Sequence, residues 1–188
     1  MNAFLSLFDP LPSRAVPWAI FLGAGATLGG ALLFEHWGGL APCALCLTQR
    51  IPYWVALAPS ALAIFFSREA NLGYAPLALL GLCSLIFLVS AGLGGYHAGV
   101  EYGWWPGPES CTGGGTMATS LEALRAGLEG AKVPQCDEVP WSLFGISLAG
   151  FNFFISLGLA ALAALPILRF LNPAHAPSEN GPVGDANA

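Results

Sequence analysis

The stretch YAPLALLGLCSLIFLVSAGLGGY, from Tyr74 to Tyr96, carries no charged residue in 23 positions. A helix needs about 20 apolar residues to cross the roughly 30 Å of hydrocarbon in a lipid bilayer. The stretch is therefore long enough to form a transmembrane helix, and it indicates that this chain of 188 residues is an integral membrane protein.

Three further apolar runs accompany it. They are uncharged over residues 15–34, 51–67 and 141–168, and the second needs residues upstream of Ile51 to reach spanning length. The first run is longer than the apolar region of a cleaved signal peptide, so we expect it to be retained. The fold class is then all-α, an integral membrane four-helix bundle, with spans at about 15–34, 47–67, 74–96 and 143–168.

The overall composition excludes other classes of protein. Hydrophobic residues make up 55% and charged residues 9%, and the mean hydropathy is +0.65. A soluble globular domain carries about 25% charged residues. Six Lys and Arg against eleven Asp and Glu leave no basic surface that could neutralise phosphates, so we expect the lipid bilayer and no nucleic acid as partner.

Four spans place both chain ends on one side of the membrane and the connections 35–46 and 97–142 on the other. Within the long connection, apolar residues from Met117 to Leu128 recur at helical spacing and predict a short amphipathic helix, which lies either on the membrane surface or on the bundle. Residues 1–171 form the membrane domain. The tail 172–188 is rich in Pro, Ala, Asn and Gly and predicts disorder.

Four of the five cysteines lie in these two connections, on one side of the membrane. They are Cys43, Cys46, Cys111 and Cys136, whereas Cys83 falls inside the third span, where we expect a buried apolar role. Disulfides persist in oxidising compartments. We therefore expect this side to be the outer one and the termini to be cytoplasmic; which of the three possible pairings the four cysteines form stays open.

Cys43 and Cys46 form a CxxC motif just before the second span. A disulfide across two residues closes too small a ring to stabilise a fold much, so redox exchange or a metal site is the usual purpose of this motif. Zinc would need four ligands at similar spacing, and Cys111 and Cys136 lie 25 positions apart with no histidine beside them, so we expect no metal. A helix N-terminus near Cys46 would favour its thiolate.

The electrons of such a thiol pair need an acceptor. The sequence contains neither the CxxCH haem motif nor a GxGxxG nucleotide motif. Because the CxxC lies at the membrane surface, a two-electron carrier that arrives through the bilayer fits its position, and a quinone is the expected carrier. Arg50, four residues after Cys46, could lie beside that sulfur or beside a bound anionic group, with interfacial anchoring as the alternative.

His97, at the end of the third span, is a candidate to protonate or orient the reduced quinone, because imidazole titrates near neutral pH. Glu101 follows it by four residues and could pair with it. An interfacial position without a chemical role is the alternative for His97.

Together these residues resemble those of a known family, the bacterial disulfide bond formation protein B, or DsbB, a quinone-linked thiol oxidase of the inner membrane. The resemblance covers Leu40 to about Phe154. It is carried by Pro42-Cys43-Ala44-Leu45-Cys46 with Gln49-Arg50, by Tyr96-His97, by Pro106-Gly107-Pro108 before Cys111, and by Cys136 followed by Trp141, Gly145 and Ser147.

The resemblance implies a role for each site residue. A periplasmic DsbA-like dithiol protein would reduce a disulfide between Cys111 and Cys136, forming its mixed disulfide at Cys111. Cys136 would then exchange with Cys43, and Cys46 would pass the electrons to ubiquinone or menaquinone beside Arg50. The resemblance also implies a multi-pass protein of the bacterial inner membrane, with its cysteine loops in the periplasm.

Two alternatives remain open at this point. One is a related thiol enzyme with another partner, either a specialised paralogue or a relative of vitamin K epoxide reductase. The other is a non-enzymatic scaffold with four spans and structural disulfides. A scaffold has no need of a CxxC beside a span, and its free-thiol number would not respond to a reduced quinone.

Overall fold

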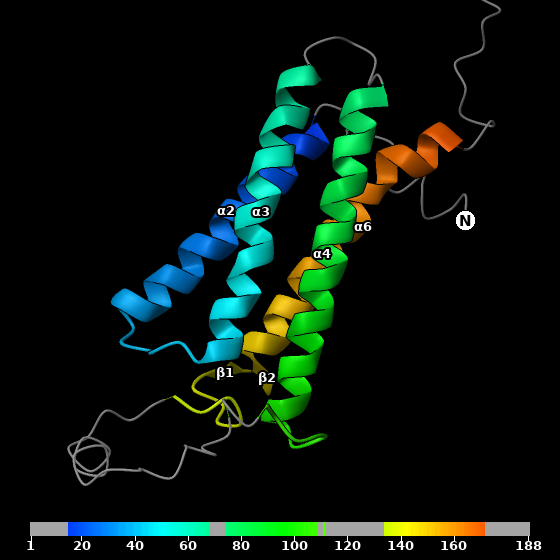
Figure 1. Cartoon of the computed structure of the whole chain (residues 1–188). Helices are drawn as coiled ribbons and strands as arrows, with labels where there is room; N and C mark the ends of the chain where they lie inside the picture. Colours follow the sequence, from blue (N-terminus) through cyan, green and yellow to red (C-terminus); the bar gives the residue numbers. More distant parts are fainter. Residues whose placement is uncertain (1–14, 68–73, 109–110, 112–133, 172–188) are drawn as a thin grey trace, which may run out of the picture.

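The computed structural model describes residues 15–67, 74–108, 111 and 134–171. They form four long helices and one short hairpin: α2 (Ala15–His36), α3 (Ala44–Phe66), α4 (Tyr74–Glu101), β1 (Ser142–Leu143), β2 (Ile146–Ser147) and α6 (Leu148–Leu171). Each helix packs against the next along the chain, and α6 also packs against α2. The β1–β2 hairpin lies at the end of the bundle where α3 begins and α4 ends (Figure 1). Predictions for the loop helix near Met117 and for the tail 172–188 lie outside these residues.

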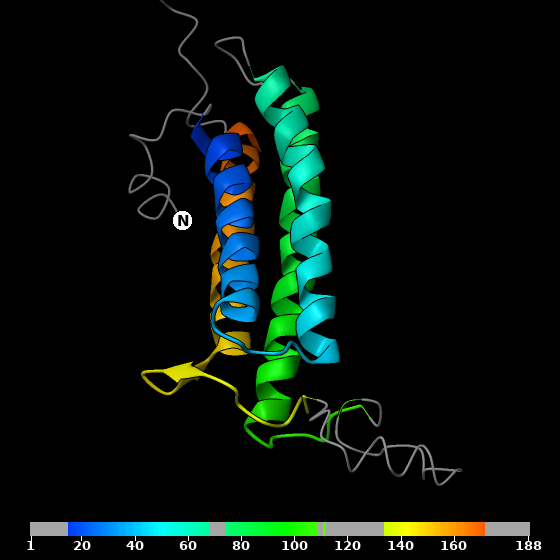
Figure 2. The ribbon, with the colours of Figure 1, turned by 90° about the vertical axis from the view of Figure 1, so that its left-hand side faces the viewer.

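The all-α class and the helical membrane architecture are confirmed. Among the described residues, α2, α4 and α6 are long and apolar enough to cross a membrane. Helix α3 forms over the second predicted span, but Gln49, Arg50 and two prolines make it less apolar than the other three. Its first turns, which hold Gln49 and Arg50, lie at the hairpin end of the bundle (Figure 2).

Two helix ends differ from the predicted span ends by more than one helical turn. Helix α4 continues through His97 to Glu101, into the predicted outer loop, and Gly103 with φ of +70° follows its end. The fourth helix begins at Leu148, because Phe144 and Gly145 have φ of +52° and +78° and turn the chain into a hairpin just before it. As a result, His97 and Glu101 are held by a rigid helix.

The middle of the bundle is an apolar core. Ile20 of α2, Tyr53 of α3, Phe87 of α4 and Ala160 of α6 are almost fully buried there. Cys83 lies in the same core and is fully buried, as predicted. This core holds the four helices together between the hairpin end and the opposite end of the bundle.

Helices α4 and α6 approach each other closely at Gly94. A Cβ atom at this position would lie 2.9 Å from the backbone nitrogen of Phe153 and 3.1 Å from the side-chain nitrogen of Asn152. Real Cβ atoms essentially never come that close to backbone, so the absence of a side chain permits this contact.

We therefore expect Gly94→Ala to lower the free energy of unfolding by about 1–3 kcal/mol, because α6 has to move away. Gly92→Ala is the matched control, since its Cβ meets no atom within 4 Å. Thermal unfolding of both variants in detergent measures the difference. Equal stability of the two variants would show that the close approach at Gly94 is not required.

Candidate functional site

The four loop cysteines come together at the hairpin end of the bundle. Cys43 caps the N-terminus of α3 and Cys46 lies in its first turn. Cys111 and Cys136 come from the connection between α4 and the hairpin, and both are buried. Cys43, Cys111 and Cys136 form one buried cluster with Val100 of α4, and the partly buried Cys46 packs against it. We call the four cysteines and Val100 together the cysteine cluster.

The segment after α4 is held against that helix before it reaches Cys111. The indole of Trp105 donates a hydrogen bond to the carbonyl of Tyr96 at 2.9 Å. Its ring lies so close to Gly99 that an added Cβ would be 2.0 Å from a ring carbon. This contact turns the chain back along α4 and directs it toward the cysteine cluster.

Two hydrogen bonds connect Cys43 and Cys46. The Cys43 thiol donates a hydrogen bond to Cys46 Sγ at 2.8 Å, and the Cys46 backbone N–H donates to Cys43 Sγ at 3.2 Å. The hydrogen bond to Cys46, followed by burial, raises the pKa of Cys43 to about 12. Cys43 therefore keeps its proton, whereas the same hydrogen bond lowers the pKa of Cys46, so Cys46 is the thiol of the pair that ionises first.

In the reduced protein at neutral pH we expect iodoacetamide to modify Cys46 at least about tenfold faster than Cys43, because the thiolate is the reactive form. Mass spectrometry of the labelled peptides over time gives both rates. Equal rates would contradict the assignment of the charge to Cys46.

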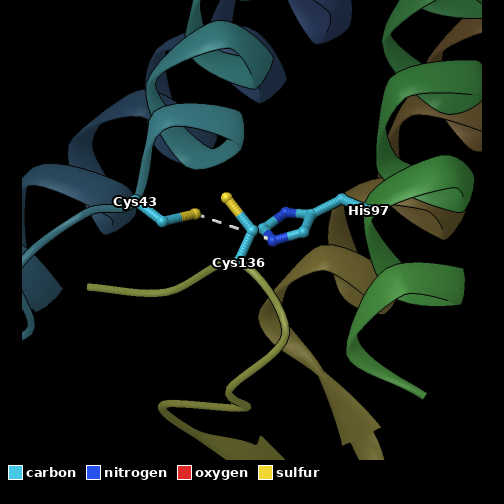
Figure 3. A group of neighbouring side chains, drawn as sticks. All are labelled: Cys43, His97 and Cys136. Carbon is cyan, nitrogen blue, oxygen red and sulfur yellow. Dashed lines mark hydrogen bonds between the residues drawn. The ribbon is translucent and has the colours of Figure 1, made fainter. Parts of the chain in front are cut away.

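Cys136 lies next to both Cys111 and Cys43. Its backbone N–H donates to the carbonyl of Cys111 at 2.9 Å, and burial, with a hydrogen bond to Cys111, raises the pKa of Cys136 to about 12. Its Sγ, Cys43 Sγ and a ring nitrogen of His97 lie within 4.8 Å of one another. Figure 3 shows the three side chains converging from α3, α4 and the loop before the hairpin.

This spacing suits thiol exchange, which requires sulfurs that can reach one another. Two thiols and an imidazole are also donors that zinc accepts, but zinc would hold the thiolates that exchange has to release. We therefore assign no metal to these three side chains.

A chain of hydrogen bonds connects His97 to the interior of the bundle. The Gln49 side chain donates to His97 Nδ1 at 2.6 Å, Asn152 donates to Gln49 Oε1 at 2.8 Å, and the Tyr53 hydroxyl donates to Asn152 Oδ1 at 2.6 Å. Because Nδ1 accepts a hydrogen bond, neutral His97 carries its proton on Nε2, which lies 3.6 Å from Cys43 Sγ. Of these partners, Asn152 and Tyr53 were not predicted; a polar residue inside an apolar span is the signal that could have indicated Asn152.

Arg50 forms an ion pair with Glu35 of α2, and both side chains are largely buried. The sequence left three possible positions for Arg50: beside Cys46 Sγ, beside a bound anionic group, or at the membrane interface as an anchor. Its protein partner in the structure is an acid from the preceding helix. Glu35 was missed, although it is a charged residue directly at the end of an uncharged run.

A cavity of about 510 Å³ adjoins the cysteine cluster. Apolar side chains from α2, α6 and the loops at the hairpin end, among them Leu28, Phe34 and Ile155, line most of it. The polar groups at its lining are few, and they include Cys46, Arg50, His97 and Glu101. A mostly apolar cavity of this size, with a few polar groups that can orient a ligand, is typical of a binding site for a small molecule.

The residues present fit a quinone. Its apolar body would contact the apolar lining, and its ring oxygens would need hydrogen-bond donors near Cys46. Glu101 has a free position for such a contact, because its Oε2 is buried and has no hydrogen-bond partner among the described residues. When protonated, this oxygen could donate a hydrogen bond to a quinone oxygen. Arg50 and Cys46 line the same cavity.

Comparison with known proteins identifies one family. Residues 13–166 match the model of the family described as disulfide bond formation protein DsbB. A protein of Methylococcus capsulatus named disulfide bond formation protein B is 34% identical over 162 residues, which cover 82% of this chain and 94% of that protein. Proteins of the same name from Marinobacter nauticus and a Polaromonas species are 31% and 26% identical, over 87% and 88% of this chain and 96% of each relative. No solved structure matches the chain significantly.

Proposed function

Because the chain belongs to the family of disulfide bond formation protein B, and is thus a multi-pass membrane protein of disulfide bond formation, we propose that it reoxidises a periplasmic DsbA-like dithiol protein and passes the electrons to a membrane quinone. The family supports a disulfide oxidoreductase in general terms. The dithiol partner, the quinone and the residue roles below are our proposal.

One observation carries the proposal. Cys46 belongs both to the cysteine cluster and to the lining of the apolar cavity, so the same residue can exchange with thiols on one side and give electrons to a ligand on the other. Bound there, ubiquinone or menaquinone would supply a two-electron, two-proton acceptor that reaches the site through the bilayer.

Thiol exchange is proposed to pass along the neighbouring sulfurs in the order Cys111, Cys136, Cys43 and Cys46. A thiolate of the dithiol partner attacks a Cys111–Cys136 disulfide at Cys111, and the partner's second thiol resolves this mixed disulfide, leaving two thiols here. Cys136 then attacks Cys43 of a Cys43–Cys46 disulfide and releases Cys46 as thiolate. Cys111 attacks Cys136 in turn, which restores the Cys111–Cys136 disulfide and releases Cys43.

The surrounding side chains support these steps. His97 Nε2–H faces Cys43 Sγ, where it can stabilise the sulfur as it leaves its disulfide. Arg50 lines the cavity from α3 and would donate hydrogen bonds to a quinone oxygen. The cysteine cluster is proposed to face the periplasm, with both termini in the cytoplasm of a bacterial inner membrane.

A turnover assay tests the proposal. We expect the purified full-length protein, given a reduced DsbA-type protein and ubiquinone or menaquinone, to produce one quinol for each dithiol oxidised, as followed by quinone absorbance and by thiol titration. Oxidation of the dithiol protein without quinol formation would refute a quinone as the electron acceptor. Absence of both reactions would refute a DsbA-type protein as the dithiol partner.

A further inference from the structure

Glu101 is a buried acid that the proposed function leaves without a role. It lies in the last turn of α4, its side chain is only 2% exposed, and it lines the cavity together with Cys46. Its Oε1 is 3.9 Å from His97 Nε2, and its Oε2 has no hydrogen-bond partner among the described residues. An ionised carboxylate is costly to bury in this way.

The titratable and charged groups around Glu101 offset the cost of burying its carboxylate only in part, because burial still raises the pKa of Glu101. On its own helix it faces His97, whose Nδ1 already accepts a hydrogen bond from Gln49. Ser147, just before α6, interacts with the carboxyl group through its hydroxyl. Across the cavity, the charge of Arg50 is committed to Glu35.

Cys46 of α3 is the group whose thiolate form disfavours the carboxylate form of Glu101. The two groups line the same cavity, and their negative charges repel each other. Cys43 and Cys136, the neighbouring thiols, retain their protons in the reduced protein. Two like charges that share a site of low polarity rarely ionise together, so the site holds either a Cys46 thiolate or a Glu101 carboxylate, with the other group protonated.

We propose that Glu101 stores the proton that Cys46 gives up as a thiolate and delivers this proton from Oε2 to the electron acceptor bound in the cavity. The inference rests on the proposed function for the identity of the acceptor, but the storage of the proton is a property of the protein alone.

The atoms and charges balance. When thiol exchange reduces the Cys43–Cys46 disulfide, the incoming dithiol gives up two electrons and two protons, and the protons end on Cys43 and Glu101 while Cys46 remains a thiolate. On reoxidation the Cys43–Cys46 bond forms again, two electrons leave the sulfurs, and the protons of Cys43 and Glu101 leave with them to the acceptor. The carboxylate of Glu101 then carries the single negative charge that the Cys46 thiolate carried before.

The storage of the proton on Glu101 is tested by the number of protons that the protein takes up when the Cys43–Cys46 disulfide is reduced. The pH dependence of the reduction potential gives this number. We expect the reduction potential of the Cys43–Cys46 pair to fall by about 60 mV per pH unit around neutral pH, since a two-electron couple changes by about 30 mV for each proton. Glu101→Gln should reduce this slope to about 30 mV, and Glu101→Asp, which keeps an acid, should restore about 60 mV. The full-length protein is used free of quinone, with Cys111 and Cys136 replaced by serine so that one redox pair is titrated in a thiol buffer.

Two results would overturn the inference. A slope of about 60 mV in both the native protein and Glu101→Gln would mean that Cys46 keeps its own proton, and a slope of about 30 mV in both would mean that Glu101 takes up none. Infrared difference spectra give a second measurement that does not depend on a variant: a protonated carboxyl band should appear when the native pair is reduced. Its absence would equally contradict the storage of a proton on Glu101.

The delivery of the proton is tested separately by turnover. We expect Glu101→Gln to lower the kcat of quinone reduction about 100-fold, the usual size of a lost general acid, and Glu138→Gln, an exposed acid outside the cavity, to leave it unchanged. An unchanged kcat in Glu101→Gln would refute delivery. If the native protein reduced no quinone while the slopes behaved as expected, the proposed acceptor would be wrong and the proton store would stand.

Discussion

Replacing Cys46 with serine is expected to lower the rate of quinone reduction by at least about 1,000-fold, the scale of loss when a reacting group is removed. Serine cannot form a disulfide with Cys43 and cannot release an electron pair to the cavity. The disulfide between Cys111 and Cys136 should still form, because these residues contact each other without Cys46. Quinone absorbance and alkylation of the denatured protein measure the two quantities.

Cys83→Ala is the matched control for this variant. Cys83 lies in the apolar core of the bundle, away from the cysteine cluster, so its loss should leave quinone reduction intact. Full quinone turnover in Cys46→Ser would remove Cys46 from the electron path and with it the link between the cysteine cluster and the cavity.

Replacing Arg50 with alanine is expected to raise the apparent KM for quinone by about tenfold or more, because a hydrogen bond from a charged donor contributes about 1.5–3 kcal/mol. The KM for the dithiol protein should change much less, since Arg50 lines the cavity and is not a member of the cysteine cluster. Initial rates with each substrate varied in turn measure both constants.

Arg50→Lys separates charge from geometry. Lysine keeps the positive charge beside Glu35 but lacks the planar guanidinium, so we expect an intermediate KM for quinone. Equal rises of both KM values in Arg50→Ala would indicate that Arg50 only anchors the helix end at the membrane surface.

The helices and the grouping of the cysteines could be predicted from the sequence. Uncharged runs of spanning length are a strong signal, since few other structures tolerate them. Counting spans placed Cys43, Cys46, Cys111 and Cys136 on one side of the membrane, and the structure brings these four residues to one end of the bundle.

The partners of the site residues could not be predicted in the same way. Helices that are apolar on every side give no periodic pattern from which to read the buried face, so the pairing of Arg50 with Glu35 and of Gln49 with Asn152 depends on helix rotation. The continuation of α4 to Glu101 was missed for another reason. The span was ended where its apolar run meets His97, whereas the backbone remains helical to Glu101, just before Gly103 turns the chain.

The most direct test of a relay between the cysteine cluster and a lipid-borne acceptor is a single turnover without the dithiol protein. The fully reduced full-length protein is mixed with one equivalent of quinone, and the remaining free thiols are trapped over time and assigned by mass spectrometry. We expect about two thiols per molecule to be lost, first at Cys43 and Cys46 and later also at Cys111 and Cys136, because exchange connects the two pairs. If quinone removed no thiol at any of the four positions, these cysteines would not pass electrons to it and the relay would be refuted.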